Sequence, residues 1–151
     1  MNQPPKPLDI LHDAVIRAAL AEAWNESEPG VTGGHEEGGF IVRGEDGRLT
    51  VRRWPKGEGN RIKVPAHAEC AVDGRPIVAT FHTHPNPGPE FLQEPSETDR
   101  RGVRDDADLK GPLYIGEFVI ADEMIYLVTP SGAVRELDRR ADLLGRKERL
   151  T

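Results

Sequence analysis

The chain has 151 residues, of which 36% are hydrophobic and 30% are charged, and its formal net charge is −6. This length is enough for one domain with a hydrophobic core, and the acidic balance argues against general nucleic-acid binding. No apolar run reaches the roughly 18 residues of a membrane span, and residues 1–7 lack the apolar core of a signal peptide. Because Cys70 is the only cysteine, neither an intramolecular disulfide nor a Cys-rich zinc site can form, and we expect a cytoplasmic protein.

The hydrophobic pattern predicts helices at both ends of the chain and in its middle, with strands between them. After an irregular lead-in over residues 1–7, apolar spacing predicts a helix over 8–25 with Val15 on its buried side. Apolar runs bounded by turn residues predict strands over 40–42, 48–54, 61–64, 77–82, 113–121, 124–129 and 133–137. Further helices are predicted over 96–106 and 138–149, the latter anchored by Leu143 and Leu144. This order indicates an α+β or mixed α/β class, with residues 8–151 as one domain.

The stretch Phe81-His82-Thr83-His84-Pro85 ends the strand predicted over 77–82. Alternate side chains of a strand share a face, so His82 and His84 point the same way. A loop rich in proline follows and can bring the carboxylate of Asp99 back to the two imidazoles. Two histidines and one carboxylate can hold Zn²⁺ and leave a fourth position for water, which is typical of catalytic zinc. Iron, cobalt or manganese could occupy the same ligands.

A metal-dependent hydrolase also needs a proton carrier and a donor to the oxyanion. Glu36-Glu37-Gly38-Gly39 stands at the start of the apolar strand 40–42, where glycines let a substrate backbone come close. A carboxylate here could take the proton of a zinc-bound water, whose pKa falls to roughly 7. The Ser96 hydroxyl could donate to the oxyanion of a tetrahedral intermediate. These residues together predict a metal-assisted amide hydrolase.

Glu-x-Gly-Gly, then His-x-His-Pro, then Ser-x-x-Asp resembles the motif set of the JAB/JAMM (MPN+) zinc metalloproteases. The resemblance implies a cytidine-deaminase-like JAB/MPN fold, a mostly antiparallel sheet flanked by N-terminal, middle and C-terminal helices. It implies a Zn²⁺ ion held by His82, His84 and Asp99. It also implies that Glu36 is the general acid/base and that Ser96 stabilises the oxyanion. The implied activity is cleavage of an isopeptide or peptide bond after the C-terminus of a ubiquitin-like protein, by Glu36-assisted attack of zinc-bound water.

Other interpretations of the same residues stay open. Ser96-x-x-Asp99 also fits a capping box at the start of a helix, and Glu37 could replace Glu36 as the base. His67-Ala68-Glu69-Cys70 contains half of a zinc deaminase signature, but the second half, Pro-Cys-x-x-Cys, cannot exist in a chain with one cysteine. The chain could also be a non-catalytic MPN-type binding scaffold, or a related zinc amidohydrolase that acts on a small amide.

Overall fold

A seven-stranded sheet forms the centre of the computed structural model, which describes residues 3–30, 33–87 and 91–145. The strands follow the order β2-β1-β4-β5-β6-β7, and β3 pairs with β4. Their bounds are Gly38–Arg43 (β1), Leu49–Arg53 (β2), Ala71–Val72 (β3), Arg75–Thr83 (β4), Glu117–Ile120 (β5), Met124–Val128 (β6) and Val134–Arg139 (β7). The β4–β5 pair is parallel and the other pairs are antiparallel. The predicted α+β class with a mostly antiparallel sheet is therefore confirmed.

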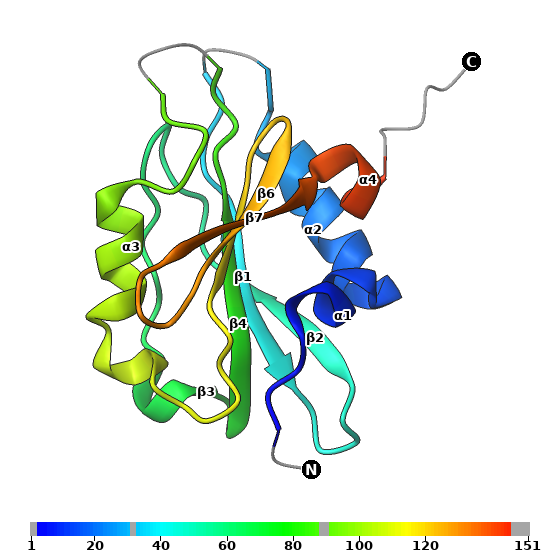
Figure 1. Cartoon of the computed structure of the whole chain (residues 1–151), viewed down its shortest axis with the longest axis vertical. Helices are drawn as coiled ribbons and strands as arrows, with labels where there is room; N and C mark the ends of the chain where they lie inside the picture. Colours follow the sequence, from blue (N-terminus) through cyan, green and yellow to red (C-terminus); the bar gives the residue numbers. More distant parts are fainter. Residues whose placement is uncertain (1–2, 31–32, 88–90, 146–151) are drawn as a thin grey trace.

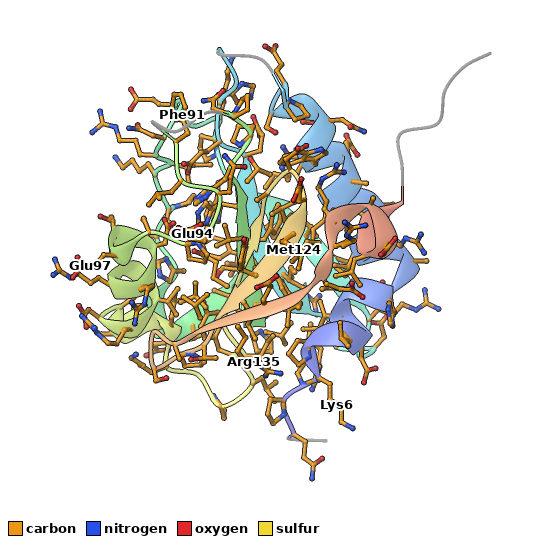
Figure 2. All side chains as sticks on the ribbon, turned by 45° about the horizontal axis from the view of Figure 1, so that its top comes forward. Lys6, Phe91, Glu94, Glu97, Met124 and Arg135 are labelled. Carbon is orange, nitrogen blue, oxygen red and sulfur yellow. The ribbon has the colours of Figure 1, made fainter. Side chains whose placement is uncertain are left out.

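Helices lie on both sides of this sheet (Figure 1). Three of them, α1 (Pro7–His12), α2 (Ala14–Glu26) and α4 (Arg140–Leu144), gather on one side, and α3 (Glu97–Arg104) lies on the other. Lys6, next to α1, and Glu97, on α3, accordingly lie on opposite sides of the molecule (Figure 2). Parallel neighbours such as β4 and β5 need a crossover connection, and α3 is part of the connection that runs over this face of the sheet. Among the described residues, none of the helices has the length and apolar character needed to cross a bilayer.

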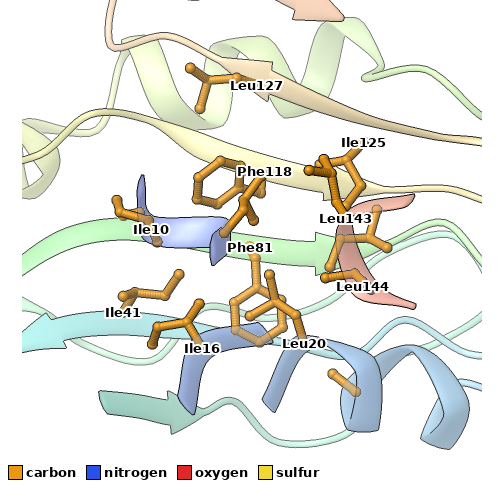
Figure 3. Close-up of a cluster of buried hydrophobic side chains, with 14 of the residues drawn as sticks. Ile10, Ile16, Leu20, Ile41, Phe81, Phe118, Ile125, Leu127, Leu143 and Leu144 are labelled. Atoms are coloured by element: carbon orange, nitrogen blue, oxygen red, sulfur yellow. The ribbon is translucent and has the colours of Figure 1, made fainter. Parts of the chain in front are cut away.

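Alternation along the strands divides the core into two layers. On β1, Ile41 belongs to the cluster under α1, α2 and α4, whereas its neighbour Phe40 belongs to the cluster on the α3 side. Figure 3 shows the first cluster, in which Leu20 of α2 lies against Phe81 of β4. Phe81 is fully buried, and burying such a side chain contributes about 1.5–3 kcal/mol. Since Phe81 points to the α1–α2–α4 side, His82 points to the α3 side.

The single helix predicted over 8–25 is wrong at one point. The chain leaves the helical conformation at Asp13, where ψ is 126°, and the Asp13 carboxylate accepts the backbone N–H groups of Val15 and Ile16. This N-cap starts a second helix with a new rotational phase. Val15, predicted to be buried, is therefore 58% exposed, while Ile10 is fully buried. The first helix begins at Pro7, inside the predicted lead-in.

Two predicted strands also differ from the structure. Residues 61–64 form no strand, and the Arg61 carbonyl accepts the N–H of Glu58 within the same loop. The strand predicted from residue 113 begins only at Glu117. Gly116, just before it, has φ +127°, which lies outside the range of regular strands.

The C-terminal boundary lies slightly later than predicted. The strand predicted over 133–137 runs to Arg139, so α4 starts at Arg140 instead of residue 138. Its predicted anchors, Leu143 and Leu144, are buried. The helix predicted to run to residue 149 is too long, because α4 ends at Leu144 and its C-cap Gly145 has a non-helical backbone with φ +82° and ψ 160°. Residues from 146 onward lie outside the described part of the chain.

Candidate metal centre

His82, His84 and Asp99 meet at the end of β4. The Nε2 atoms of the two histidines lie 3.1 Å apart. His82 Nε2 is 3.3 Å from Asp99 Oδ1, and His84 Nε2 is 3.2 Å from Asp99 Oδ2. One donor atom of each residue lies within 4.8 Å of the others. The predicted cluster therefore exists, and its two imidazoles and one carboxylate could hold a metal ion.

The residue between the histidines joins β4 to the segment before β1. Thr83 is fully buried, and its Oγ1 accepts the Glu37 N–H at 3.0 Å. The Thr83 N–H donates in turn to the Glu37 carbonyl at 2.9 Å. This reciprocal pair anchors the segment that carries Glu36 and Glu37 beside the two histidines.

Asp99 reaches the site from the first turn of α3, where it also completes a capping box. Ser96 Oγ accepts the Asp99 N–H at 3.0 Å, and Asp99 Oδ2 accepts the Ser96 N–H at 2.8 Å. The capping-box interpretation is thus confirmed. It does not compete with metal binding, because the same carboxylate faces both histidines.

Hydrogen bonds on the far side of each imidazole determine which nitrogen can bind a metal. His82 Nδ1 lies 3.0 Å from Glu117 Oε2 on β5, and His84 Nδ1 lies 3.1 Å from the Gln93 carbonyl oxygen. Both oxygens are acceptors, so we assign a proton to each Nδ1. In the neutral imidazoles the lone pair is then on Nε2, the atom that faces Asp99. This donor set fits a divalent cation such as zinc.

Burial and ion pairing act against each other in this cluster. Burial favours the neutral form of His82, but the carboxylates of Glu117 and Asp99 outweigh it and raise the pKa of His82 well above its usual value. Burial likewise favours the protonated form of Asp99, but hydrogen bonds to His82 and His84 hold its pKa well below the usual range. Because a metal ion binds the neutral imidazole, cation binding would therefore release the proton that the raised pKa favours on His82.

Glu36 and Glu37 have different surroundings. Glu36 is 5% exposed and lines the cavity above the histidines. Burial raises its pKa, although attraction to His82 and His84 opposes the shift. Glu37 instead pairs with His35, at 2.5 Å between Oε2 and Nε2, and with Arg53, at 2.5 Å between Oε1 and Nη2. Its carboxylate is thus occupied by partners outside the cluster.

A cavity of about 560 Å³ lies over the cluster. It is lined by charged and polar residues of the candidate site: Glu36, His82, His84, Ser96, Asp99 and Glu117. Other parts of its lining come from residues 59–62, from Val64, and from Phe91 and Leu92. The cavity is therefore polar around the candidate metal position and apolar where Val64 and Leu92, which are 40% and 54% exposed, meet solvent.

The deaminase half-motif does not assemble into a second centre. Both ring nitrogens of His67 are engaged, by the Pro65 carbonyl and by Asp106, each at 2.7 Å. Cys70 is buried, and burial raises the pKa of its thiol, which is unfavourable for a nucleophile. In the part of the chain that the structure describes, the His82-His84-Asp99 group is the one metal-ligand cluster found.

Fold and site together define an α+β protein with a His-His-Asp centre of the kind that metallohydrolases use. The chain belongs to the family of prokaryotic homologs of the JAB domain, whose family model matches residues 10–140. Comparisons with curated proteins and with solved structures gave no match. Family membership supports two kinds of function, a metal-dependent isopeptidase or an MPN-type scaffold.

Proposed function

We propose that this protein is a zinc-dependent peptidase or isopeptidase that cleaves the bond after the C-terminus of a ubiquitin-like protein. The observation that carries the proposal is that the three candidate ligands and the buried Glu36 share one cavity. A scaffold needs no such complete set of ligands and base, so the set favours the enzyme. Membership in the prokaryotic JAB family supports the choice of an isopeptidase among metallohydrolases.

His82, His84 and Asp99 would hold the zinc ion, which supplies Lewis-acid chemistry by activating water and polarising the scissile carbonyl. Glu36 receives a proton on its carboxylate and then delivers it to the leaving amine. Its raised pKa suits this exchange, because a general acid/base works best when its pKa lies near the operating pH.

The Ser96 hydroxyl is the candidate donor to the oxyanion. Its oxygen accepts the Asp99 N–H, so its own hydrogen stays available for a substrate oxygen in the cavity that Ser96 lines. Removing one such donor typically lowers turnover by about 10²–10³-fold. The capping box therefore fixes both the hydroxyl and the neighbouring carboxylate on the same helix start.

The cavity lining suits the extended end of a protein chain. Residues 59–62 and Val64 line the cavity without joining the sheet, and Val64 and Leu92 expose apolar surface. A narrow tail ending in small residues could reach the cluster here, whereas a folded domain would stay outside. A small amide would also fit, and this amidohydrolase alternative is separated by experiment.

The test compares Glu36→Gln with its matched neighbour Glu37→Gln in the zinc-loaded protein. Substrates are a panel of ubiquitin-like proteins with C-terminal extensions, and a short amide. We expect Glu36→Gln to lower turnover by about 10²–10⁴-fold, whereas Glu37→Gln keeps most of the activity because its carboxylate is bound to Arg53 and His35. Full activity of Glu36→Gln would exclude this mechanism. Turnover of the short amide alone would favour the amidohydrolase, and no turnover of either would favour the scaffold.

A further inference from the structure

Glu117 is a buried carboxylate to which the proposed reaction gives no role. It is 8% exposed, opens β5, and lines the cavity. In the parallel β4–β5 pair, Glu117 stands opposite Thr80, and His82 stands opposite Val119. The Glu117 side chain therefore reaches along the sheet to the neighbouring same-face residue of β4, where Oε2 lies 3.0 Å from His82 Nδ1.

The position of this contact shows how Glu117 could act. It meets His82 at Nδ1, whereas the cluster with His84 and Asp99 forms at Nε2, on the other side of the ring. Glu117 thus lies behind the ligand and is not one of the three converging donors. His84 has the equivalent support from the neutral backbone carbonyl of Gln93, so a full negative charge stands behind only one of the two histidines.

We propose that Glu117 is a positioning residue that holds the His82 imidazole in its Nε2-binding orientation and strengthens cation binding. Carboxylates that accept the second N–H of a metal-bound histidine fix its ring and make it a better donor. The effect is enhanced by burial, because a low local dielectric strengthens the hydrogen bond. The inference rests on the metal site of the proposed function but not on its substrate.

The experiment measures zinc affinity of the full chain by competition with a chelator at constant pH, and records the visible absorption of the Co²⁺ form. Glu117→Gln removes the charge but keeps an acceptor for Nδ1, and Glu117→Leu removes both. Tyr114→Phe is the matched control, since it removes another buried hydrogen bond near Glu117, the one between the hydroxyl groups of Tyr114 and Thr80 at 2.8 Å. Circular dichroism and thermal unfolding verify that each variant is folded.

We expect zinc affinity to fall by about tenfold in Glu117→Gln and up to about 100-fold in Glu117→Leu. The Co²⁺ spectrum should keep its shape in the Gln variant and change in the Leu variant, and Tyr114→Phe should match the wild type in both measurements. A residue that only supports the sheet would change neither the zinc affinity nor the Co²⁺ spectrum of a folded variant.

Wild-type affinity in a folded Glu117→Leu variant would overturn the inference. If that variant does not fold, unchanged affinity in Glu117→Gln has the same meaning. Loss of binding in Glu117→Gln as complete as in Asp99→Ala would make Glu117 a direct ligand, and absence of cation binding in the wild type would also refute the inference. Peptide cleavage is measured separately. If the wild type cleaves a substrate but the Glu117 variants bind zinc as tightly as the wild type, only this inference is refuted. If the zinc affinities change as expected but no substrate is cleaved, only the proposed function is refuted.

Discussion

Replacing Thr83 by valine tests the pair of hydrogen bonds between Thr83 and Glu37, which anchors the segment carrying Glu36 to β4. Thr83 is fully buried, and its Oγ1 accepts the Glu37 N–H at 3.0 Å. Valine has nearly the same shape but no acceptor, so a buried N–H is left unpaired, at a cost of about 1–3 kcal/mol in the free energy of unfolding. For a domain of this size each kcal/mol lowers Tm by about 2–4 °C, which gives a fall of roughly 2–12 °C.

Urea unfolding and calorimetry of Thr83→Val and Thr83→Ser measure this cost. The serine variant keeps the hydroxyl and loses one methyl group, so it reports the packing contribution without the broken hydrogen bond. Zinc-dependent turnover should fall in the valine variant and persist in the serine variant, because the segment with Glu36 loses one of its two bonds to Thr83. A valine variant as stable as the wild type would show that the hydrogen bond from the Thr83 N–H to the Glu37 carbonyl is sufficient to anchor this segment.

Two further perturbations test the candidate ligands and the ion pair between His67 and Asp106. Mass spectrometry of protein purified without chelator should find about one zinc per chain, largely lost in Asp99→Ala; no zinc after reconstitution would leave Asp99 as a helix cap only. Burial lowers the pKa of His67, but hydrogen bonds to the Pro65 carbonyl and to Asp106 outweigh it and raise the pKa overall. Because the folded-state pKa is the higher one, this pair stabilises fully below the unfolded value of 6.5 and loses its effect as pH rises. The difference in unfolding free energy between wild type and Asp106→Asn should therefore be largest below pH 6.5 and shrink as the pH rises above it. A difference that stays constant with pH would contradict the assignment.

Local rules explain the parts of the site that the sequence predicts. Strand alternation alone places His82 and His84 on one face, and their Nε2 atoms indeed lie 3.1 Å apart. The helix start at Ser96 follows from short-range capping chemistry, and Ser96 and Asp99 form that box. Both features depend on residues within three positions of each other, so they need no knowledge of the fold.

The supporting contacts depend on strand pairing, which the sequence does not reveal. Glu117 is 35 residues from His82, and only the parallel β4–β5 register brings them together. One signal was present, since a glutamate that opens an apolar strand, Glu117-Phe118-Val119-Ile120, must be buried beside a partner. The partner itself could not be named before the strand order was known.

The choice between Glu36 and Glu37 shows the same limit. Their sequence context is shared, and both are almost fully buried. The structure separates them through Arg53, which β2 brings beside β1 in a register that pairs Gly39 with Arg53. Arg53 and His35 bind Glu37, which supports Glu36 as the base in the proposed mechanism.

Asp99 serves both roles predicted for the Ser96-x-x-Asp99 motif, as part of a capping box and as a candidate metal ligand. Free in solution, a carboxylate must be ordered before it can bind a cation, and that ordering opposes binding. Here the Ser96 N–H already holds Asp99 Oδ2 at 2.8 Å, while Oδ1 stays 3.3 Å from His82 Nε2. The helix start therefore orders the ligand through bonds that do not need the cation. The capping box orders the Asp99 carboxylate before a cation binds, as a preorganised metal ligand requires. Its presence therefore supports the metal site.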